Sequence, residues 1–210
     1  MAVDDPAFHV LLGPDYAGKS SVMAALGSEE PDWQLLSVDE AFLRPEHVLV
    51  AELRHALVGD VVPGLGGAYS LDFMATLMQT AVVHLRDRIR TADPRRLILV
   101  DSYYYKILAK CRLAGLDESP AYAWWRTFPQ PQSVIYLEVS ARKAWRRCGR
   151  GAEVNRLEHY GDRPLQAGFT AYQADLDSIM SREVAHLPVG VVHEQDSVAD
   201  TVSAVRKALR

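Results

Sequence analysis

The residues best suited to chemistry lie near the N-terminus, in the stretch GPDYAGKS from Gly13 to Ser20. This stretch fits G-x-x-x-x-G-K-[ST], the pattern of a phosphate-binding loop. Its glycines let the backbone turn around a phosphate, and the helix that follows adds unpaired N–H groups. Lys19, which we expect to be exposed at the loop mouth, supplies a cation for the β- and γ-phosphates of ATP. The predicted cofactor contacts are Gly13, Pro14, Asp15, Tyr16, Ala17, Gly18, Lys19, Ser20 and Ser21.

A magnesium site is the second element that this pattern predicts. The Ser20 hydroxyl is placed to bind Mg²⁺ beside the phosphates. Asp101 directly follows the apolar run from Leu97 to Val100, which is the arrangement of a Walker B carboxylate. The alternative is that Asp101 only caps the helix that follows. We predict that Ser20 and Asp101 are the metal ligands.

Three further carboxylates indicate where an acceptor could bind. Asp15 lies inside the loop, where a negative charge near bound phosphates is costly unless it faces an acceptor hydroxyl or positions an arginine. The alternative is a solvated loop aspartate. Asp39 and Glu40 follow the second predicted strand, where a general base for a hydroxyl acceptor would lie. They could instead cap the next helix.

A group of arginines follows the fourth predicted strand and could stabilise the charge of a transferring phosphoryl group. We expect a lid at approximately 146–165, with Arg146, Arg147 and Arg150 as its catalytic candidates. The basic residues of this region are Arg142, Lys143, Arg146, Arg147, Arg150, Arg156 and Arg163. We expect about half of them to belong to a solvated helix face instead.

Strands and helices alternate along the chain and must position these residues. Apolar runs predict strands at 10–12, 33–38, 96–100, 133–139 and 188–192. Helical patterns cover 18–26, 45–57, a long segment capped by Ser70, 103–113, 120–126, 141–150, 166–180 and 198–209. Residues 59–69 are expected to form a flexible loop. This alternation predicts an α/β fold with a parallel sheet covered on both faces and ligands at the carboxyl ends of its strands.

The composition restricts the function further. The chain has 210 residues and a net charge of −4, which predicts one domain over 1–210 and disfavours non-specific nucleic-acid binding. Its two cysteines lack metal-ligand spacing, and no signal peptide or membrane-length apolar run is apparent. We therefore expect a cytoplasmic protein with no nucleic-acid or membrane partner. The long amphipathic helix that begins at Leu71 could serve the core or a homodimer face.

Together these motifs resemble the thymidylate kinase family of P-loop nucleoside and nucleotide kinases. GPDYAGKS resembles its phosphate loop, LVDSYYYK its strand-end Asp-Arg-Tyr motif, and LDFMATLMQ its base-reading helix. YLEVSARKAWRRCGRG resembles its fourth strand and lid, and FTAYQADL the helix after the lid. The resemblance implies a three-layer fold with a five-stranded parallel sheet in the order 2-3-1-4-5. It also implies an acceptor pocket formed by Asp15, Asp39, Arg44, Phe73, Leu77, Ser102, Tyr103 and Lys106.

The chain departs from the family pattern at three positions. Ser102 stands where the Asp-Arg-Tyr motif has its arginine, and Leu77 stands where a base-reading arginine is expected. Tyr16 stands where some members have an arginine in the phosphate loop. The first hypothesis is an ATP- and Mg²⁺-dependent kinase that phosphorylates a nucleotide-like acceptor. The second is a kinase that acts on a nucleoside or another neutral hydroxyl, with Asp39 or Glu40 as general base. The third is a regulator that binds a nucleotide without transferring phosphate.

Overall fold

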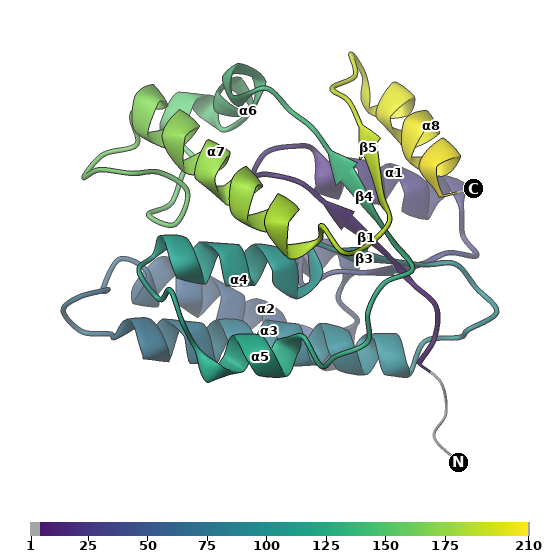
Figure 1. The fold of residues 1–210 in the computed structure, drawn as a ribbon, viewed down its shortest axis with the longest axis horizontal. Coiled ribbons are helices and arrows are strands. Elements are labelled where there is room, and N and C mark those ends of the chain that lie inside the picture. Colours follow the sequence, from purple (N-terminus) through teal and green to yellow (C-terminus); the bar gives the residue numbers. More distant parts are fainter. Residues whose placement is uncertain (1–4, 210) are drawn as a thin grey trace.

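A computed structural model describes residues 5–209 and contains a five-stranded parallel sheet with helices on both faces (Figure 1). The strands are β1 (His9–Leu12), β2 (Gln34–Leu36), β3 (Ile98–Asp101), β4 (Ser133–Leu137) and β5 (Val189–Val192). Their order is β2-β3-β1-β4-β5, and each neighbouring pair is parallel. The predicted fold class and strand order are therefore confirmed.

Eight α-helices are described, and serine side chains cap several of their N-termini. The Ser70 hydroxyl accepts a hydrogen bond from the Phe73 N–H, as the sequence predicted, and Ser140 does the same for Lys143. Such caps satisfy N–H groups that have no partner within the helix. The helices are α1 (Lys19–Glu29), α2 (Val48–Ala56), α3 (Leu71–Arg90), α4 (Tyr103–Leu113), α5 (Pro120–Trp125), α6 (Ala141–Arg147), α7 (Gln166–Glu183) and α8 (Val198–Ala208).

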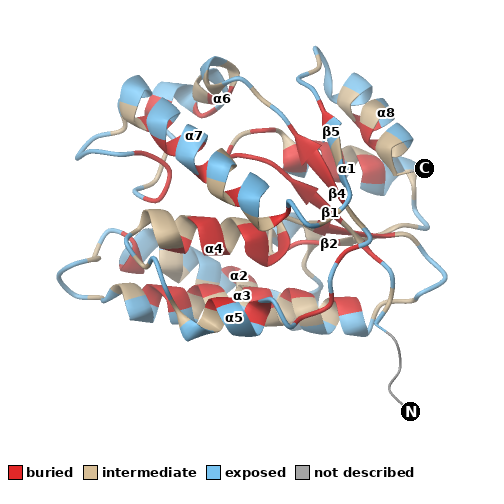
Figure 2. Ribbon diagram, in the orientation of Figure 1, coloured by how far each residue is buried: buried red, intermediate tan, exposed pale blue. Residues whose placement is uncertain are grey.

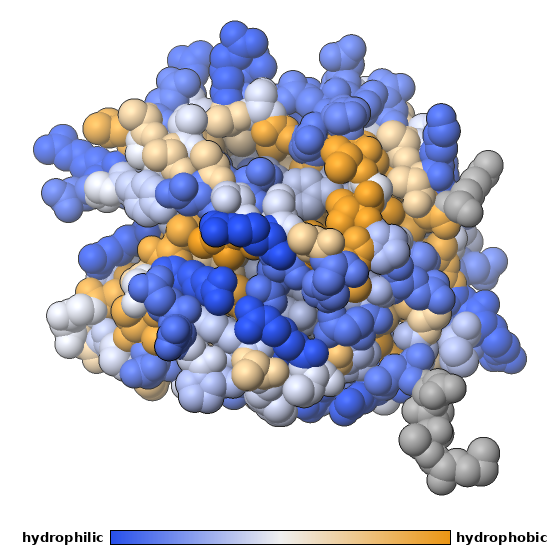
Figure 3. Space-filling view, viewed as in Figure 1, coloured by the Kyte–Doolittle hydropathy of each residue, from blue (hydrophilic) through white to orange (hydrophobic). Residues whose placement is uncertain are grey.

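The sheet separates two apolar cores, because successive strand residues point to opposite faces. Val10 and Leu12 of β1 face the larger core, which α3, α4, α5 and α7 complete. Leu11 faces the smaller core, which α1 and α8 complete. Figure 2 shows this burial along the strands and the inner sides of the helices. On the face drawn in Figure 3, hydrophilic side chains dominate and hydrophobic surface is limited to smaller patches.

Two segments differ from the predicted elements. Helix α1 continues through Gly27, where the sequence predicted a stop, and a Cβ at Gly27 would come within 3.2 Å of the Leu35 side chain. The glycine therefore lets the helix pack closely against β2. The predicted helix over 45–57 is divided into a short 3-10 helix (Pro45–His47), α2 and a π-helical turn (Leu57–Val61). That turn brings Val61 into the core, so the predicted loop begins later.

The sheet order brings the predicted phosphate and metal residues together. Strand β1 leads directly into the loop that begins at Gly13, and β3 ends at Asp101. The register pairs Leu11 with Asp101 across the two neighbouring strands. Both segments therefore lie at the carboxyl edge of the sheet, where parallel α/β sheets bind their ligands. Within residues 5–209, no helix combines the length and apolarity that crossing a bilayer requires.

Candidate active site

The predicted phosphate-binding loop, residues 13–20, has the backbone that its glycines allow. Gly13 and Gly18 have φ angles of 151° and 96°, and Gly18 is the N-cap of α1. A Cβ at Gly13 would lie 2.6 Å from the Leu137 carbonyl oxygen, so no larger residue fits between the loop and β4. Tyr16 also has a positive φ of 60°, an uncommon conformation for a non-glycine residue. The loop thus follows a tight path around the start of α1.

Lys19 folds back into this loop instead of standing exposed at its mouth. Its Nζ donates hydrogen bonds to the carbonyl oxygens of Gly13 and Pro14, both at 3.0 Å. Only 8% of Lys19 is exposed, so the prediction of an exposed lysine is wrong. Burial, and next the charge of Lys106, lower the pKa of Lys19 to about 7. A bound phosphate would supply the negative charge that favours the protonated amine.

Asp15 is buried and bound by two lysines of α4. Its Oδ1 lies 2.6 Å from Lys106 Nζ, and its Oδ2 lies 3.2 Å from Lys110 Nζ. Gln173 of α7 accepts a hydrogen bond from the Asp15 N–H and donates one to its carboxylate. Burial alone would raise the pKa of Asp15, but the charges of Lys106 and Lys110 outweigh it and hold this pKa well below its usual range. The solvated alternative for Asp15 is therefore excluded.

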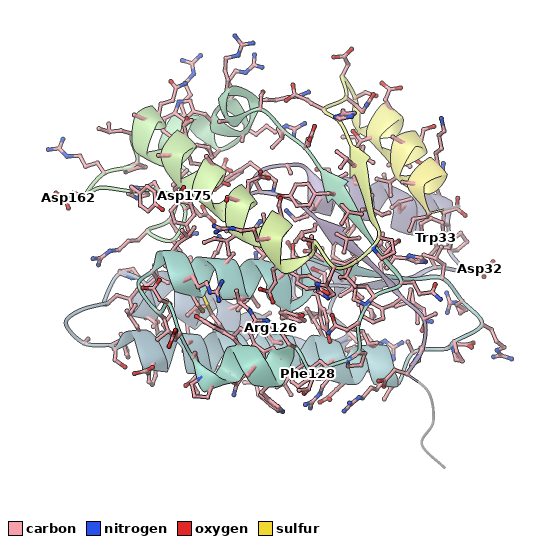
Figure 4. The ribbon with its side chains drawn as sticks, viewed as in Figure 1. Asp32, Trp33, Arg126, Phe128, Asp162 and Asp175 are labelled. Atoms are coloured by element: carbon pink, nitrogen blue, oxygen red, sulfur yellow. The ribbon has the colours of Figure 1, made fainter. Side chains whose placement is uncertain are left out.

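The same network reaches the lid segment, here residues 146–165. Lys110 Nζ lies 3.2 Å from Glu158 Oε1, so one lysine joins the loop carboxylate to a lid carboxylate. The Tyr16 hydroxyl has two acceptors for its single proton, Glu158 Oε2 at 3.1 Å and the Glu153 carbonyl oxygen at 2.8 Å. Nearby, Tyr160 donates to Asp175 of α7, which Figure 4 labels. These contacts attach the lid segment to both the loop and α7.

Asp101 and Ser20 offer oxygen ligands of the kind that Mg²⁺ prefers. The Asp101 carboxylate accepts hydrogen bonds from Ser37 at 3.0 Å and Ser102 at 2.8 Å, which fix its orientation. Ser20 is exposed in the first turn of α1. Residues 5–209 contain no group of three or more His, Cys, Asp or Glu side chains that could hold a metal ion. One carboxylate and one hydroxyl suit an ion that keeps water and phosphate oxygens as its other ligands.

Of the three predicted lid arginines, Arg147 is the one with a recorded contact to the loop. Its Nη1 donates to the Tyr16 carbonyl oxygen at 3.0 Å. The same atom lies 3.3 Å from where a Cβ of Gly18 would be. Arg146 and Arg150 are exposed, and Arg150 has a φ of 54° in the turn after α6. Of these three arginines, Arg147 is thus the one whose contact with the phosphate-binding loop the structure shows.

The segment after β2 holds its acidic residues in local contacts. Asp39 caps the short 3-10 helix that begins at Glu40 and accepts a hydrogen bond from the Ala41 N–H at 3.4 Å. Arg54 Nη1 lies 3.9 Å from Asp39 Oδ2. Glu40 is exposed. The capping alternative is therefore observed for Asp39, and a role of Asp39 or Glu40 as general base stays a prediction.

The remaining predicted acceptor residues are in different environments. Phe73 is 46% exposed and stacks on Tyr69, whereas Leu77 packs against the larger core. Ser102 lies at the sheet edge beside Asp101. Tyr103 is only 1% exposed, and its ring contacts Phe8 edge-on within the core. The expectation that Tyr103 contacts the acceptor is therefore corrected, because its ring is enclosed by core residues.

Arg44 was also expected at the acceptor. It is exposed and lies 3.8 Å from Glu46, outside the network around Asp15. Sequence reasoning missed Lys110, Glu158 and Gln173. Lys106 and Lys110 are four residues apart on α4, and this spacing on one helix face was the available signal. Glu158 and Gln173 had no comparable local signal.

No protein-family model and no curated protein matches the sequence. Solved structures do match. A deoxyadenosine kinase from M. mycoides with products dCMP and dCDP bound has a TM-score of 0.63 at 14% identity, over 96% of this chain and 97% of that one. The thymidylate kinase from Candida albicans also has a TM-score of 0.63 at 14% identity, over 98% and 91% of the two chains. The chain therefore has the fold of the thymidylate kinase-like P-loop kinases.

Proposed function

We propose that the protein is an ATP- and Mg²⁺-dependent phosphotransferase that acts on a nucleotide-like acceptor. The main support is that Lys19 and Ser20, at the end of the glycine-bounded loop, lie at the same edge of the sheet as Asp101. This set supplies N–H donors, a cation and two oxygen ligands to a triphosphate and its metal. The structural neighbours include a deoxyadenosine kinase structure with bound dATP, which supports nucleotide binding by a protein of this fold.

Each side chain has a distinct part in the proposed transfer. Lys19 exchanges its two carbonyl partners for phosphate oxygens when the nucleotide binds. Arg147, already held against Tyr16, approaches the loop from the lid and offsets negative charge on the transferring phosphoryl group. Ser20 and Asp101 would hold Mg²⁺, which would neutralise phosphate charge, and the hydrogen bonds from Ser37 and Ser102 fix the Asp101 carboxylate. The lid contacts of Glu158 help to exclude water from the loop.

The acceptor side favours a phosphate-bearing acceptor over a neutral hydroxyl. Ser102 lacks the positive charge of the arginine expected there, but Lys106 lies one helical turn further along α4. Lys106 is bonded to Asp15, so a basic group already faces the loop from the acceptor side. In contrast, Asp39 is engaged in capping. We therefore place the acceptor phosphate near Lys106.

The direct test is an ADP-release assay with ATP and Mg²⁺ over nucleoside monophosphates, the matching nucleosides and other small alcohols. We expect release with at least one monophosphate and little with the nucleosides. Lys19→Met is the control, because methionine fills a similar volume without the charge. Turnover of nucleosides alone would favour the hydroxyl alternative. Tight ATP binding without turnover of any compound would favour the regulator.

A further inference from the structure

A polar cleft of about 240 Å³ lies along β2, separate from the phosphate-binding loop. Strand β2 is at the edge of the sheet, so within residues 5–209 no strand pairs with its outer side. The cleft is bounded by this strand, the segment after it and the C-terminal half of α3. Trp33, which Figure 4 labels, lies at its β2 side. Of its lining residues, Ser37 alone has a part in the function proposed above, as a hydrogen-bond donor to Asp101.

The cleft is also distant from the predicted acceptor positions on α3. Its α3 residues include His84 and Arg88, whereas the acceptor residues predicted on α3 are Phe73 and Leu77. Arg44, which was also predicted at the acceptor, lines the cleft instead. At about 1.5 Å per residue, Arg88 is about 22 Å further along the helix axis than Phe73. Ser37 connects the two regions, because it lines the cleft and donates to Asp101. An occupant of the cleft would therefore be distinct from an acceptor bound near Phe73.

Three arginines give the cleft an excess of positive charge. Arg44, Arg88 and Arg96 all line it. Glu46 lies 3.8 Å from Arg44 and is the acidic partner recorded for these three arginines within residues 5–209. Arg96 donates its hydrogen bonds to backbone carbonyl oxygens of residues 31–33, and its charge is one of the causes that lower the pKa of Asp93. Burial, and next the charge of Arg44, lower the pKa of Arg88, as expected for a cation held near another cation.

Two histidines add hydrogen-bonding groups to the same cleft. The rings of His47 and His84 meet edge-on with 4.8 Å between their centroids. The Nε2 atom of His47 is buried and has no hydrogen-bond partner among the residues that the structure describes, which is a costly state for a polar atom. Burial is the main cause that lowers the pKa of His84. An anionic oxygen in the cleft would provide an acceptor for an N–H at His47 Nε2.

We propose that this cleft binds a small phosphate-bearing anion, with Arg44, Arg88 and Arg96 as its cations and His47 as a hydrogen-bond donor. Guanidinium groups suit this ligand, because their planar N–H pairs match phosphate oxygens in a bidentate geometry. The cavity is large enough for a compact anion such as pyrophosphate.

The experiment is isothermal titration of the full chain with pyrophosphate, for the wild type, Arg88→Gln, Arg44→Gln and Lys19→Met. We expect each arginine variant to raise the dissociation constant of one pyrophosphate-binding event by about tenfold or more. The same event should be retained in Lys19→Met. A second event, lost only in Lys19→Met, would belong to the loop. The loop assignment and the cleft proposal can therefore fail independently. Two results would overturn the cleft proposal. One is that pyrophosphate binds at a single site that only Lys19→Met loses, and the other is that the wild type does not bind pyrophosphate.

Arg90→Gln is the matched control, because Arg90 is on the same helix as Arg88 but does not line the cleft. It should bind pyrophosphate as the wild type does. Arg44 is exposed, so Arg44→Gln should fold even if Arg88→Gln does not. Equal weakening in Arg90→Gln and Arg44→Gln would show a general charge effect and would contradict a specific site. Inorganic phosphate and a nucleoside monophosphate, titrated in the same way, distinguish the possible sources of the phosphate group.

Discussion

The Nζ atom of Lys106 lies 2.6 Å from Oδ1 of Asp15 at a place where both side chains are largely buried. Lys110 binds the other oxygen of the same carboxylate at 3.2 Å. This arrangement explains how the predicted phosphate-binding loop can contain an acidic residue. Because two cations offset its charge, Asp15 need not repel a bound triphosphate as an unpaired carboxylate would. The loop, α4 and the lid segment are thereby joined through charged groups.

Asp15→Asn should strongly destabilise the protein. The amide keeps the size of the side chain but leaves Lys106 without its counterion and Lys110 with Glu158 alone. Breaking a buried pair in this way costs about 3–5 kcal/mol. Urea unfolding at pH 7 measures the loss of unfolding free energy. Asp162→Asn is the matched control, because Asp162 is an exposed aspartate of the lid segment (Figure 4). Equal, small effects of the two substitutions would contradict the proposed importance of the network.

The same residue predicts an acid dependence of stability. The pKa of Asp15 is lowered in the folded state despite its burial, because Lys106 and Lys110 favour the charged form. Its stabilising contribution is therefore fully present above the carboxyl's ordinary pKa and is lost as the pH falls below it. Unfolding free energies measured from pH 6 down to pH 3 should fall more steeply for the wild type than for Asp15→Asn. Parallel curves would show that Asp15 has an ordinary pKa.

How far the sequence predicts this structure depends on whether the signal is local. The apolar strand before Gly13 and the apolar run before Asp101 are local patterns, and both predicted their places at the sheet edge. The contact of Gln173 with Asp15 joins residues 158 positions apart, and no periodicity in either segment predicts it. The burial of Lys19 was missed for a related reason, since its carbonyl partners depend on how the loop folds back.

Lys19→Met should abolish phosphoryl transfer while the fold is retained. Methionine is preferred to alanine because Lys19 is buried, and a smaller side chain would open a cavity. The lost charge acts mainly on the transferring phosphoryl group, so kcat should fall by about a hundredfold or more. The measurement is ADP release with an acceptor identified in the assay described above, together with circular dichroism of the variant. Wild-type turnover in a folded Lys19→Met protein would contradict the loop assignment.

The ligand-free protein should become more stable as the pH rises above 7, and Lys19 should be one cause. Its pKa in the folded state is about 7, mainly because of burial, whereas an unfolded lysine has its ordinary higher value. Between these values the unfolded chain binds the extra proton, so the unfolding free energy rises by up to about 1.4 kcal/mol per pH unit. Urea unfolding from pH 7 to 9 should give a steeper rise for the wild type than for Lys19→Met. Identical slopes would show that Lys19 stays charged in the free protein.

Asp39→Asn and Glu40→Gln distinguish the two kinds of acceptor. A hydroxyl acceptor must lose a proton, so removing the base should lower kcat by about a hundredfold or more, with a smaller change in the KM for ATP. A phosphate acceptor is already ionised and needs no base. Because Asp39 is a capping residue and Glu40 is exposed, we expect both amides to keep kcat within about tenfold of the wild type.

The control for these amides is Lys106→Met, which removes the cation that we place at the acceptor phosphate. It should raise the KM for the acceptor by about tenfold or more and leave the KM for ATP less affected, because the ionic contact is to the acceptor. The measurement is kcat and both KM values for the three variants with one monophosphate. Asp15 loses a partner in Lys106→Met, so urea unfolding must first confirm that the variant is folded at the assay temperature. A large fall of kcat in Asp39→Asn or Glu40→Gln, with an unchanged acceptor KM in folded Lys106→Met, would overturn the phosphate-acceptor proposal in favour of a hydroxyl.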